Sequence, residues 1–396
     1  MRLMILTDLM IVKTKLSAYS KIALNLAQRI SGRHQIAHTP MLRVNKMGPF
    51  SWPLTDEQKM LVYPSGDEEF GEDVIERNYM HFNADAVLTL KDLCVFDRLS
   101  LLPLEWIPYC PIDGSPVVSG IVNRLRHAFK TVTMSEFGYE ELRKIGIKST
   151  MIYHGVGDEY RRLEDREACR RRYFIKPEEF LIGFVGMNTL RKNASRVVEV
   201  IRATRDLNPD VDVKGFMWTN IDREVPLKPV IMDLGMNEHI HWPNPEMFDY
   251  GLPEANMVEM YNCFDCTITV ANEGFWMPGI ESLRCGVPLI APDYAAAADR
   301  VAHGCGYKVK IRDWSRNDPI AVRQPLVDVV DAARKITKII NGDREKYARR
   351  CVRESDKYRW SKLIEEKWNP FLEECEAELR PMIKAGKIAR WDQEIE

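Results

Sequence analysis

The stretch from Asn272 to Pro292, NEGFWMPGIESLRCGVPLIAP, constrains the fold of this 396-residue chain more than any other part. It follows the apolar, β-branched run CTITV and opens with the acid Glu273, after which two glycines and a proline bring a turn. Residues 282–285 then predict a short helix that Gly286 ends, and the apolar residues after it predict another strand. The pattern therefore indicates a strand, a loop, a helix and a strand, the repeating unit of a parallel α/β sheet.

The loop within this unit carries the residue types of a ligand site. Loops at the carboxyl ends of parallel strands are where ligands bind in α/β proteins. Backbone N–H groups at a helix N-terminus suit an anion, and the carboxylates of Glu273 and Glu281 suit hydroxyl groups. An ordinary β-loop-α unit with two acids on its surface is the alternative interpretation.

Seven residues separate Glu273 from Glu281, and the segment resembles the E-x7-E motif of the family 4 retaining glycosyltransferases. Five further residues take part in the resemblance: Gly274, Phe275, Pro278, Gly286 and Pro288. Those enzymes have the GT-B fold. The resemblance therefore implies an α/β chain with two facing Rossmann-like domains, parallel sheets and a C-terminal helix that crosses back to the first domain. It covers most of the chain beyond residue 105, and the first strand and helix more loosely.

By this resemblance, the segment binds the donor substrate, a nucleoside-diphosphate sugar. Glu281 is expected to hydrogen-bond the ribose hydroxyls, and Glu273 is expected to face the sugar as a catalytic residue. Four residues of the loop are expected to bind the donor, the last three through their backbone N–H groups: Gly274, Phe275, Trp276 and Met277.

A second strand followed by a glycine lies at residues 180–186, FLIGFVG. It leads to a helix predicted over 194–205, for which Asn193 is the expected N-cap. The turn between the two, from Gly186 to Asn193, resembles the family's phosphate-binding segment. Lys192 matches the lysine that stabilises the departing diphosphate, which is a catalytic role.

Gly186 and Arg191 in the same turn are also expected to bind the donor. Met187 stands where the family usually has an arginine, so Arg191 or a cation elsewhere has to compensate. The physical need for cations is plain, because a departing nucleoside diphosphate gains negative charge that positioned cations stabilise. Cations at a helix N-terminus oppose the helix dipole, which favours a functional reason for Arg191 and Lys192 over a charged surface turn.

Residues 106–114 predict a strand that enters a turn, and Asp113 stands in the Asp-Gly part of that turn. Family members usually have a histidine near this point, close to the donor sugar. Asp113 is therefore a further candidate catalytic residue, next to the sugar or the acceptor, and an ordinary turn is the alternative.

The loop after the first strand differs from that of many family members. Residues 8–20 contain no glycine and offer hydrogen-bond donors instead, among them Lys13, Lys15 and Ser17. A binding loop and a solvated loop before a capped helix both remain open. Further along, the charged run 161–172 indicates a solvated helix and linker. We therefore expect an acceptor-side N-terminal domain over 1–158, completed by residues 357–396, and a nucleotide-sugar-binding domain over 159–356.

The composition excludes some classes of function. The net charge of −2 provides no basic field that would indicate nucleic-acid binding. No apolar run approaches the ~20 residues of a transmembrane helix, and the apolar N-terminus reads as a buried first strand, not a signal peptide. The nine cysteines are scattered, and the lone CxxC at Cys263–Cys266 lacks the second pair of a zinc site. Reduced thiols in a cytoplasmic protein are therefore favoured.

A metal site is not favoured either. His239 and His241 alternate on an expected strand as a metal pair would, but no third ligand has suitable spacing. GT-B glycosyltransferases generally need no bound metal, so the resemblance implies no metal and no cofactor besides the donor substrate. The residues after this strand are candidates for the base pocket: Trp242, Pro243 and Asn244.

The chain is therefore expected to be a metal-independent, retaining glycosyltransferase of the hexosyltransferase kind. Its donor would be a UDP- or GDP-linked sugar, and its acceptor a hydroxyl of a carbohydrate, a lipid-linked molecule or a protein. Two alternatives remain open. One is a GT-B sugar-nucleotide epimerase, which releases a free sugar without an acceptor. The other is a sugar-nucleotide-binding protein without transfer activity, which the departure at Met187 makes credible.

Overall fold

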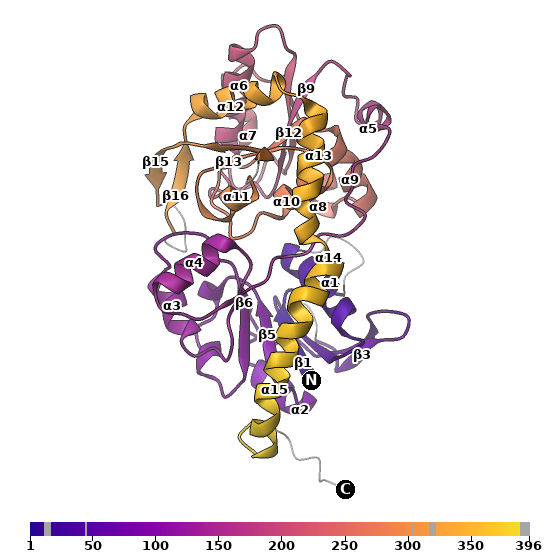
Figure 1. The fold of residues 1–396 in the computed structure, drawn as a ribbon, viewed down its shortest axis with the longest axis vertical. Helices are drawn as coiled ribbons and strands as arrows, with labels where there is room; N and C mark the ends of the chain where they lie inside the picture. The colour runs from indigo at the N-terminus through magenta and orange to yellow at the C-terminus, as the bar shows by residue number, and fades with distance from the viewer. Residues whose placement is uncertain (12–16, 44–45, 302–303, 317–321, 389–396) are drawn as a thin grey trace. The chain divides into compact units, whose positions relative to one another are not determined.

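The computed structural model describes residues 1–11, 17–43, 46–301, 304–316 and 322–388. The chain divides into two compact units (Figure 1). The N-terminal unit comprises Met1–Pro111, Val117–Gly155 and Ser361–Glu396, and the C-terminal unit comprises Ile112–Pro116 and Val156–Trp360. The candidate catalytic residue Asp113 therefore belongs to the C-terminal unit, together with the other candidate site residues.

The N-terminal unit is built on a sheet whose described strands follow the order β3-β4-β2-β1-β5-β6-β7-β8. Neighbouring strands are parallel except β3 and β4. The strands span β1 Arg2–Thr7, β2 Gln35–Pro40, β3 Phe50–Pro53, β4 Lys59–Val62, β5 Ala86–Leu90, β6 Trp106–Cys110, β7 Val132–Thr133 and β8 Thr150–Met151. β1, β5 and β6 are almost wholly buried and apolar, as strands covered on both faces must be.

Helices cover this sheet, and the sequence explains where they begin and which residues they bury. Their bounds are α1 Ala18–Ile30, α2 Ile75–Phe82, α3 Ser119–Leu125, α4 Glu136–Lys144, α14 Trp360–Leu363 and α15 Asn369–Lys384. Helix α1 begins where expected, because the side chain of Ser17 accepts a hydrogen bond from the backbone N–H of Ser20. Its residues Ile22, Leu26 and Ile30, spaced four apart, are buried.

The C-terminal segment belongs to the N-terminal unit, which confirms the expected return of the last helix. A π-helix, Ile364–Trp368, leads into α15. The buried ring of Trp368 packs edge-on against Tyr109 of β6, with 5.1 Å between ring centroids. On α15, Glu374 and Glu378 pair with Lys130 at 2.9 and 2.6 Å. Aromatic packing and these ion pairs together hold the segment in place.

The C-terminal unit contains a second parallel sheet, with the described strands in the order β11-β10-β9-β12-β13-β14. The strands span β9 Phe180–Val185, β10 Val213–Trp218, β11 Ile240–His241, β12 Cys266–Ile268, β13 Leu289–Pro292 and β14 Gly306–Val309. A separate antiparallel pair consists of β15 Ile311–Ser315 and β16 Gln324–Val327. The α/β class and the parallel sheets predicted from the sequence are confirmed.

Helices also cover the second sheet. Their bounds are α5 Arg166–Arg172, α6 Ala194–Leu207, α7 Leu227–Asp233, α8 Pro245–Tyr250, α9 Glu254–Cys263, α10 Met277–Arg284, α11 Ala295–Arg300, α12 Val329–Ile340 and α13 Arg344–Ser355. Helices α6 and α12 lie side by side in Figure 1 and bury apolar residues such as Val197, Ile201 and Ile336 in the core of this unit. No helix within the described ranges has both the length and the apolar character needed to cross a lipid bilayer.

Three elements differ from the sequence-based expectation. Helix α10 begins at Met277, five residues before the predicted start, because Trp276 takes a left-handed conformation (φ 71°) and Pro278 is tolerated in a first turn. Strand β11 contains only Ile240 and His241, so His239 does not share a strand face with His241. The apolar spacing of residues 326–340 predicts a helix from Leu326, but α12 starts at Val329, because Leu326 and Val327 belong to β16.

Candidate functional site

The sheet of the C-terminal unit has a topological switch point between β9 and β12. From β9 the chain continues outward to β10 and β11 on one side, and β12 to β14 fill the other side. The two strands are direct neighbours, with Thr267 paired to Gly183. Ligands of open α/β sheets bind at the carboxyl ends of the strands at such a point. The loops that follow β9 and β12 contain the candidate residues from 186–193 and 272–277.

Glu273 and Lys192 meet at this edge of the sheet. One carboxylate oxygen of Glu273 accepts a short hydrogen bond from Lys192 Nζ. The other oxygen lies 3.6 Å from Nη1 of Arg191, and that nitrogen also donates to the backbone oxygen of Asn272 at 2.6 Å. Two cations therefore contact one buried carboxylate, and the negative charge of Asp113 also acts on Lys192.

The charge of Lys192 is sensitive to its surroundings. Burial lowers the pKa of Lys192 below its usual value, and the positive charge of Arg191 lowers it further, whereas Glu273 and Asp113 act in the opposite direction. An added anion at this point would favour the protonated lysine, because it supplies a further opposite charge. The lysine is thus placed to respond to a bound phosphate group.

Asp113 is brought next to the same loop through its backbone. Its carbonyl oxygen accepts a hydrogen bond of 3.1 Å from the side chain of Asn272, which is fully buried. Asn272 Oδ1 has no hydrogen-bond partner among the residues that the structure describes. Sequence reasoning missed Asn272. A polar residue directly after an apolar buried strand was the signal that could have identified it.

The glycine-containing loop before α10 presents its backbone, not its large side chains. Phe275 and Trp276 are both 4% exposed, so their rings pack into the unit. Arg300 lies against the Phe275 ring, with its guanidinium carbon 4.5 Å from the ring centroid. A Cβ on Gly279 would come within 2.5 Å of the Trp276 ring, so a residue without a side chain is required there. The positive end of α10 faces this loop.

Three residues at this edge have left-handed backbone conformations that non-glycine residues rarely adopt. Asn193 has φ 48°, Trp276 has φ 71° and Ala295 has φ 54°. They stand at the starts of α6, α10 and α11, which follow β9, β12 and β13. Asn193 occupies the expected N-cap position, but its side chain makes no capping hydrogen bond because of this conformation. Residues in such conformations cluster at functional sites.

Glu281 lies on α10 and is buried, at 7% exposed. One of its oxygens accepts a hydrogen bond of 2.6 Å from the hydroxyl of Tyr261 on α9. Burial and then the negative charge of Glu281 raise the pKa of Tyr261 well above its usual value, so the phenol stays protonated and donates. Tyr261 orients the carboxylate, and the sequence contained no local signal for this contact.

Gly186 follows β9 in an open position. A Cβ built on it would meet only Phe184 Cζ, at 3.7 Å, which is ordinary contact. On Gly183, by contrast, a Cβ would come within 2.2 Å of the Phe264 ring. Packing therefore requires glycine at 183 but not at 186, and the space in front of Gly186 is available to a ligand.

Met187 is 38% exposed, and its sulfur lies 4.0 Å from Nη1 of Arg223. Arg223 stands in the loop after β10 and also pairs with Asp249 at 3.3 Å. A cation thus lies beside the position at which the resemblance expects an arginine. Because Arg191 is engaged with Glu273 and Asn272, Arg223 is a further candidate to compensate for Met187.

Other sequence candidates do not join this cluster. Trp242 packs against the hydrophobic core, and Asn244 caps α8 by accepting from the N–H of Glu246 at 2.9 Å. His239 Nδ1 lies 3.4 Å from Lys214 Nζ. Within the described ranges, no group of three or more histidine, cysteine or acidic side chains is placed to hold a metal ion.

The loop after β1 is described only in part. Lys13 and Lys15 lie outside the described residues. Ser17 donates to Asp8 Oδ2 at 2.7 Å, and Lys91 lies 2.7 Å from the other oxygen of Asp8. The hydroxyl of Ser17 is therefore engaged within the N-terminal unit.

Two Rossmann-like units in one chain, the second of which contains these switch-point loops, define the GT-B fold of glycosyltransferases. Solved structures confirm this fold. HepE from Anabaena, in complex with UDP, is similar with a TM-score of 0.66 and 12% identity, over 94% of this chain and 100% of that chain. Sucrose-phosphate synthase from Thermosynechococcus elongatus is similar with a TM-score of 0.67 and 10% identity, over 95% and 100%.

WaaG, a glycosyltransferase involved in lipopolysaccharide biosynthesis, is similar with a TM-score of 0.63 and 12% identity, over 90% of this chain and 96% of that chain. No sequence profile of a known family and no curated protein matches the chain. The resemblance of the sequence to GT-B glycosyltransferases is therefore confirmed at the level of the fold.

Proposed function

We propose that this chain is a retaining glycosyltransferase that transfers a sugar from a nucleoside-diphosphate donor to an acceptor hydroxyl. The observation that carries the proposal is the meeting of Lys192 and Glu273 across the switch point. A cation suited to phosphate and a carboxylate suited to a sugar lie on the loops of two adjacent strands. The GT-B fold supports the same function.

The proposed donor is a UDP-linked sugar, with a GDP-linked sugar as the alternative. HepE, which shares the fold, has been solved with UDP-glucose. In our proposal Glu281, oriented by Tyr261, binds the ribose hydroxyls. The open space at Gly186 and the backbone of Gly274 to Met277 accommodate the diphosphate and the sugar.

The chemistry follows from where charge develops. As the bond between the sugar and the phosphate breaks, negative charge accumulates on the leaving diphosphate. Lys192, Arg191 and the N-terminus of α10 stabilise that charge. The carboxylate of Glu273 stabilises the positive charge that develops on the sugar ring, which has oxocarbenium-ion character.

The acceptor oxygen attacks from the face that the diphosphate leaves, and the departing phosphate takes the proton of the acceptor hydroxyl. The new bond therefore has the configuration of the old one. Asp113 is proposed to act next to the sugar or the acceptor. In our proposal the cations supply the positive charge that a metal ion would otherwise provide, and the reaction needs no cofactor.

Donor binding is proposed to change the partner of Lys192. In the structure Lys192 is hydrogen-bonded to Glu273. The phosphate oxygens of a donor compete for the same ammonium group, which turns the Glu273 carboxylate toward the sugar. Phosphate binding and placement of the catalytic carboxylate are thereby coupled.

The acceptor is proposed to be a hydroxyl of a carbohydrate, a lipid-linked molecule or a protein, and the location to be the cytoplasm. The net charge of −2 supports the expectation that nucleic acid is not a partner.

The test combines binding with product analysis. Calorimetry with UDP and with GDP is expected to give one site per chain, which Lys192→Met weakens. Transfer from the preferred donor is expected to continue in chelator and to give a product with the anomeric configuration of the donor, as read by NMR. An inverted product would exclude the retaining mechanism. Sugar release without any acceptor would identify an epimerase, and binding without turnover would identify a non-catalytic protein.

A further inference from the structure

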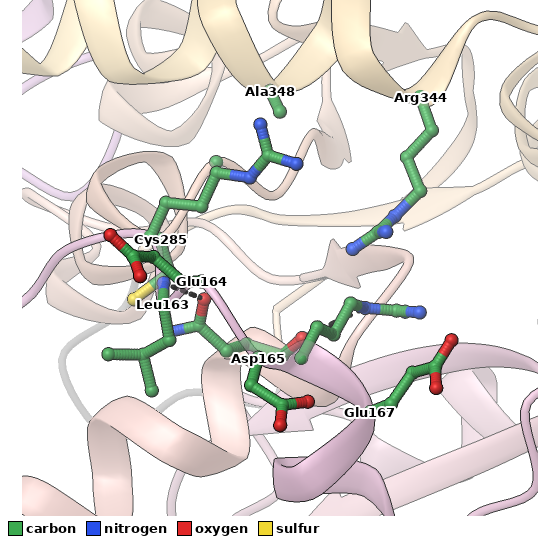
Figure 2. A pocket seen from close by; sticks show the side chains of 11 residues that line it. Leu163, Glu164, Asp165, Glu167, Cys285, Arg344 and Ala348 are labelled. Carbon is green, nitrogen blue, oxygen red and sulfur yellow. Dashed lines mark hydrogen bonds between the residues drawn. The ribbon is translucent and has the colours of Figure 1, made fainter.

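The arginines of the C-terminal unit differ in what surrounds them. Several line a cavity of about 450 Å³ next to the end of α10, where Figure 2 shows Arg344 on one side and Asp165 and Glu167 on the other. The lining contains as many acids as arginines: Glu164, Asp165 and Glu167, and Arg162, Arg166 and Arg344. The charges of the cavity walls therefore balance, and the cavity offers no surplus charge to a ligand.

Arg300, the last residue of α11, lies against aromatic rings instead. It is 2% exposed, and its guanidinium carbon lies 4.5 Å from the centroid of the Phe275 ring and 5.0 Å from that of the Tyr358 ring. The two rings contact each other edge to face, with their centroids 6.1 Å apart. Nη1 of Arg300 also donates a hydrogen bond to the hydroxyl of Tyr358. The guanidinium therefore joins a ring of the donor loop to a ring from a distant part of the chain.

Core packing alone does not explain a buried arginine at this position. Moving a guanidinium out of water is unfavourable, and an apolar side chain of similar size would fill the same space without that penalty. Contacts with the two rings recover part of the penalty, because the face of an aromatic ring attracts a cation. The dipole of α11 favours a cation at its last residue, but an exposed side chain would satisfy it equally well. The burial of Arg300 therefore points to a role in holding the rings that it contacts.

Helix α11 contacts the donor loop near both of its ends. Near its start, the backbone N–H of Ala296 donates a hydrogen bond of 3.0 Å to the backbone oxygen of Glu273. About one turn later, Arg300 lies against the ring of Phe275. In the loop, only Gly274 separates these two residues. One helix thus holds Glu273 through its backbone and Phe275 through its ring.

Tyr358, the other ring that Arg300 contacts, is itself fixed by the chain around it. Its backbone oxygen accepts a hydrogen bond of 2.8 Å from the backbone N–H of Val156. Val156 also forms a β-bridge with Arg359, whose Nε lies 3.0 Å from Asp158 Oδ1. All of these residues belong to the C-terminal unit. Arg300 is therefore fixed by Tyr358 on one side and contacts the donor loop on the other.

We propose that Arg300 is a positioning residue for sugar transfer. By fixing the Phe275 ring, it keeps the carboxylate of Glu273 and the backbone N–H groups of the donor loop in the arrangement that receives the sugar and the diphosphate. Such groups accelerate a reaction only when they are held in place before the charge develops. The inference rests on the proposed function of this loop and adds to it a residue that touches neither the sugar nor the diphosphate.

The first test needs no donor and measures hydrogen exchange on the full chain. Arg300→Met keeps an apolar side chain in the space but removes the planar cation. In this variant the amides of residues 272–277 are expected to exchange at least tenfold faster than in the wild type, because the loop opens more often once the Phe275 ring is released. Exchange in β9 should not change. Equal exchange of residues 272–277 in the two proteins would overturn the inference.

The second test measures UDP affinity by calorimetry and the transfer rate at a saturating donor concentration. Arg300→Met is expected to lower both at least tenfold. Arg300→Lys keeps the charge but loses the planar group that contacts both rings, so it should remain impaired. Wild-type affinity and rate in Arg300→Lys would show that the charge alone matters and would overturn the positioning role.

A double-mutant cycle tests whether Arg300 acts through Phe275. If it does, Arg300→Met combined with Phe275→Leu should weaken UDP binding no more than Phe275→Leu does alone, because the contact is already lost. Additive losses would show that the two residues act independently and would refute the proposal. Tyr358→Phe removes only a hydroxyl and serves as a milder variant if Arg300→Met does not fold. Unchanged exchange of residues 272–277 in that variant would then count against the inference.

The matched control is Arg170→Met, with Arg170→Lys in reserve. Arg170 is also 2% exposed and lies in the same unit, but it pairs with Asp265 at 2.8 Å. Its loss should lower the melting temperature without changing UDP affinity or the exchange of residues 272–277. If the control changes both, the effects of Arg300→Met reflect a general loss of stability, and the inference fails. A wild type that binds neither UDP nor GDP would overturn the proposed function and this inference with it, whereas wild-type binding that Arg300→Met leaves unchanged would overturn this inference alone.

Discussion

Replacing Glu273 by glutamine should have two opposite effects on one site. Glu273→Gln keeps the shape and the hydrogen-bonding capacity of the side chain but removes its charge. In the structure that charge holds Lys192, by a short hydrogen bond, and Arg191, at 3.6 Å. We expect the variant to bind UDP more tightly and to transfer sugar more slowly.

The magnitude follows from the geometry. Two unit charges about 4 Å apart near a protein surface interact by about 4 kcal/mol at an effective dielectric constant of ~20. The side chains of Arg191 and Lys192 are 29% and 18% exposed, so solvent screens part of this attraction. If about a third of one pair's interaction is released to the diphosphate, UDP gains about 1.4 kcal/mol, or about tenfold in affinity. The transfer rate should fall by roughly tenfold or more, because the carboxylate acts on charge that develops only in the transition state.

The assay measures both quantities on the same preparations. Calorimetry gives the affinity for UDP, and single-turnover transfer gives the rate of the chemical step. The matched control is Glu199→Gln, which removes a carboxylate from an ion pair with Arg196, 2.7 Å long, on α6. This control should change neither quantity, because neither residue of that pair takes part in the donor cluster.

Two results would refute the reasoning. If Glu273→Gln binds UDP no more tightly than the wild type, the carboxylate does not restrain the cations in solution. If the variant transfers sugar at the wild-type rate, Glu273 does not act on the sugar, and the likeness of the motif reflects the fold alone.

Three further predictions concern the same edge of the sheet. Tyr261→Phe should weaken the binding of UDP about tenfold, because it removes the hydroxyl that donates a hydrogen bond to the buried carboxylate of Glu281. The transfer rate at a saturating concentration of the sugar donor should not change. An unchanged calorimetric affinity would contradict this prediction. Gly186→Ala should weaken the binding of UDP without lowering the melting temperature. Gly183→Ala should lower the melting temperature, because its Cβ comes within 2.2 Å of the Phe264 ring in the core. Equal melting temperatures of the two variants would contradict the packing argument. Burial and Arg191 lower the pKa of Lys192, and only the protonated lysine attracts phosphate, so the affinity for UDP should fall as the pH rises toward the usual lysine value of 10.5. The wild type should lose more affinity over this pH range than Lys192→Met does. Equal losses in the two proteins would show that the lysine plays no part.

Much of this site could be predicted from the sequence, because its parts are local. A strand, a glycine and a helix in succession place Gly186 and Lys192 at a sheet edge, and the same pattern places Glu273 and Glu281 there. Their proposed roles remain predictions. What the local pattern cannot contain is which side chains of the two loops meet, and the ion pair between Lys192 and Glu273 joins loops from different strands.

The contacts that orient the site residues could not be predicted from the local sequence pattern either. Tyr261 comes from the helix before β12 and looks like an ordinary apolar helix residue in the sequence. The start of α10 was predicted too late, because nothing in the pattern shows that Trp276 adopts a left-handed conformation. The short β11 was predicted as a longer strand, because alternation over four residues does not reveal where pairing with β10 ends.

The left-handed residues Asn193, Trp276 and Ala295 have a consequence for finding the relatives of this chain. Each non-glycine residue in such a conformation costs about 1–3 kcal/mol, and glycine removes that cost without disturbing the backbone path. Substitution to glycine at these three points should therefore recur as sequences diverge, while the spacing to the strands before them is kept. At identities of 10–15%, where solved structures share the fold but overall sequence comparison fails, a profile that allows glycine at these helix starts would align such relatives on backbone geometry.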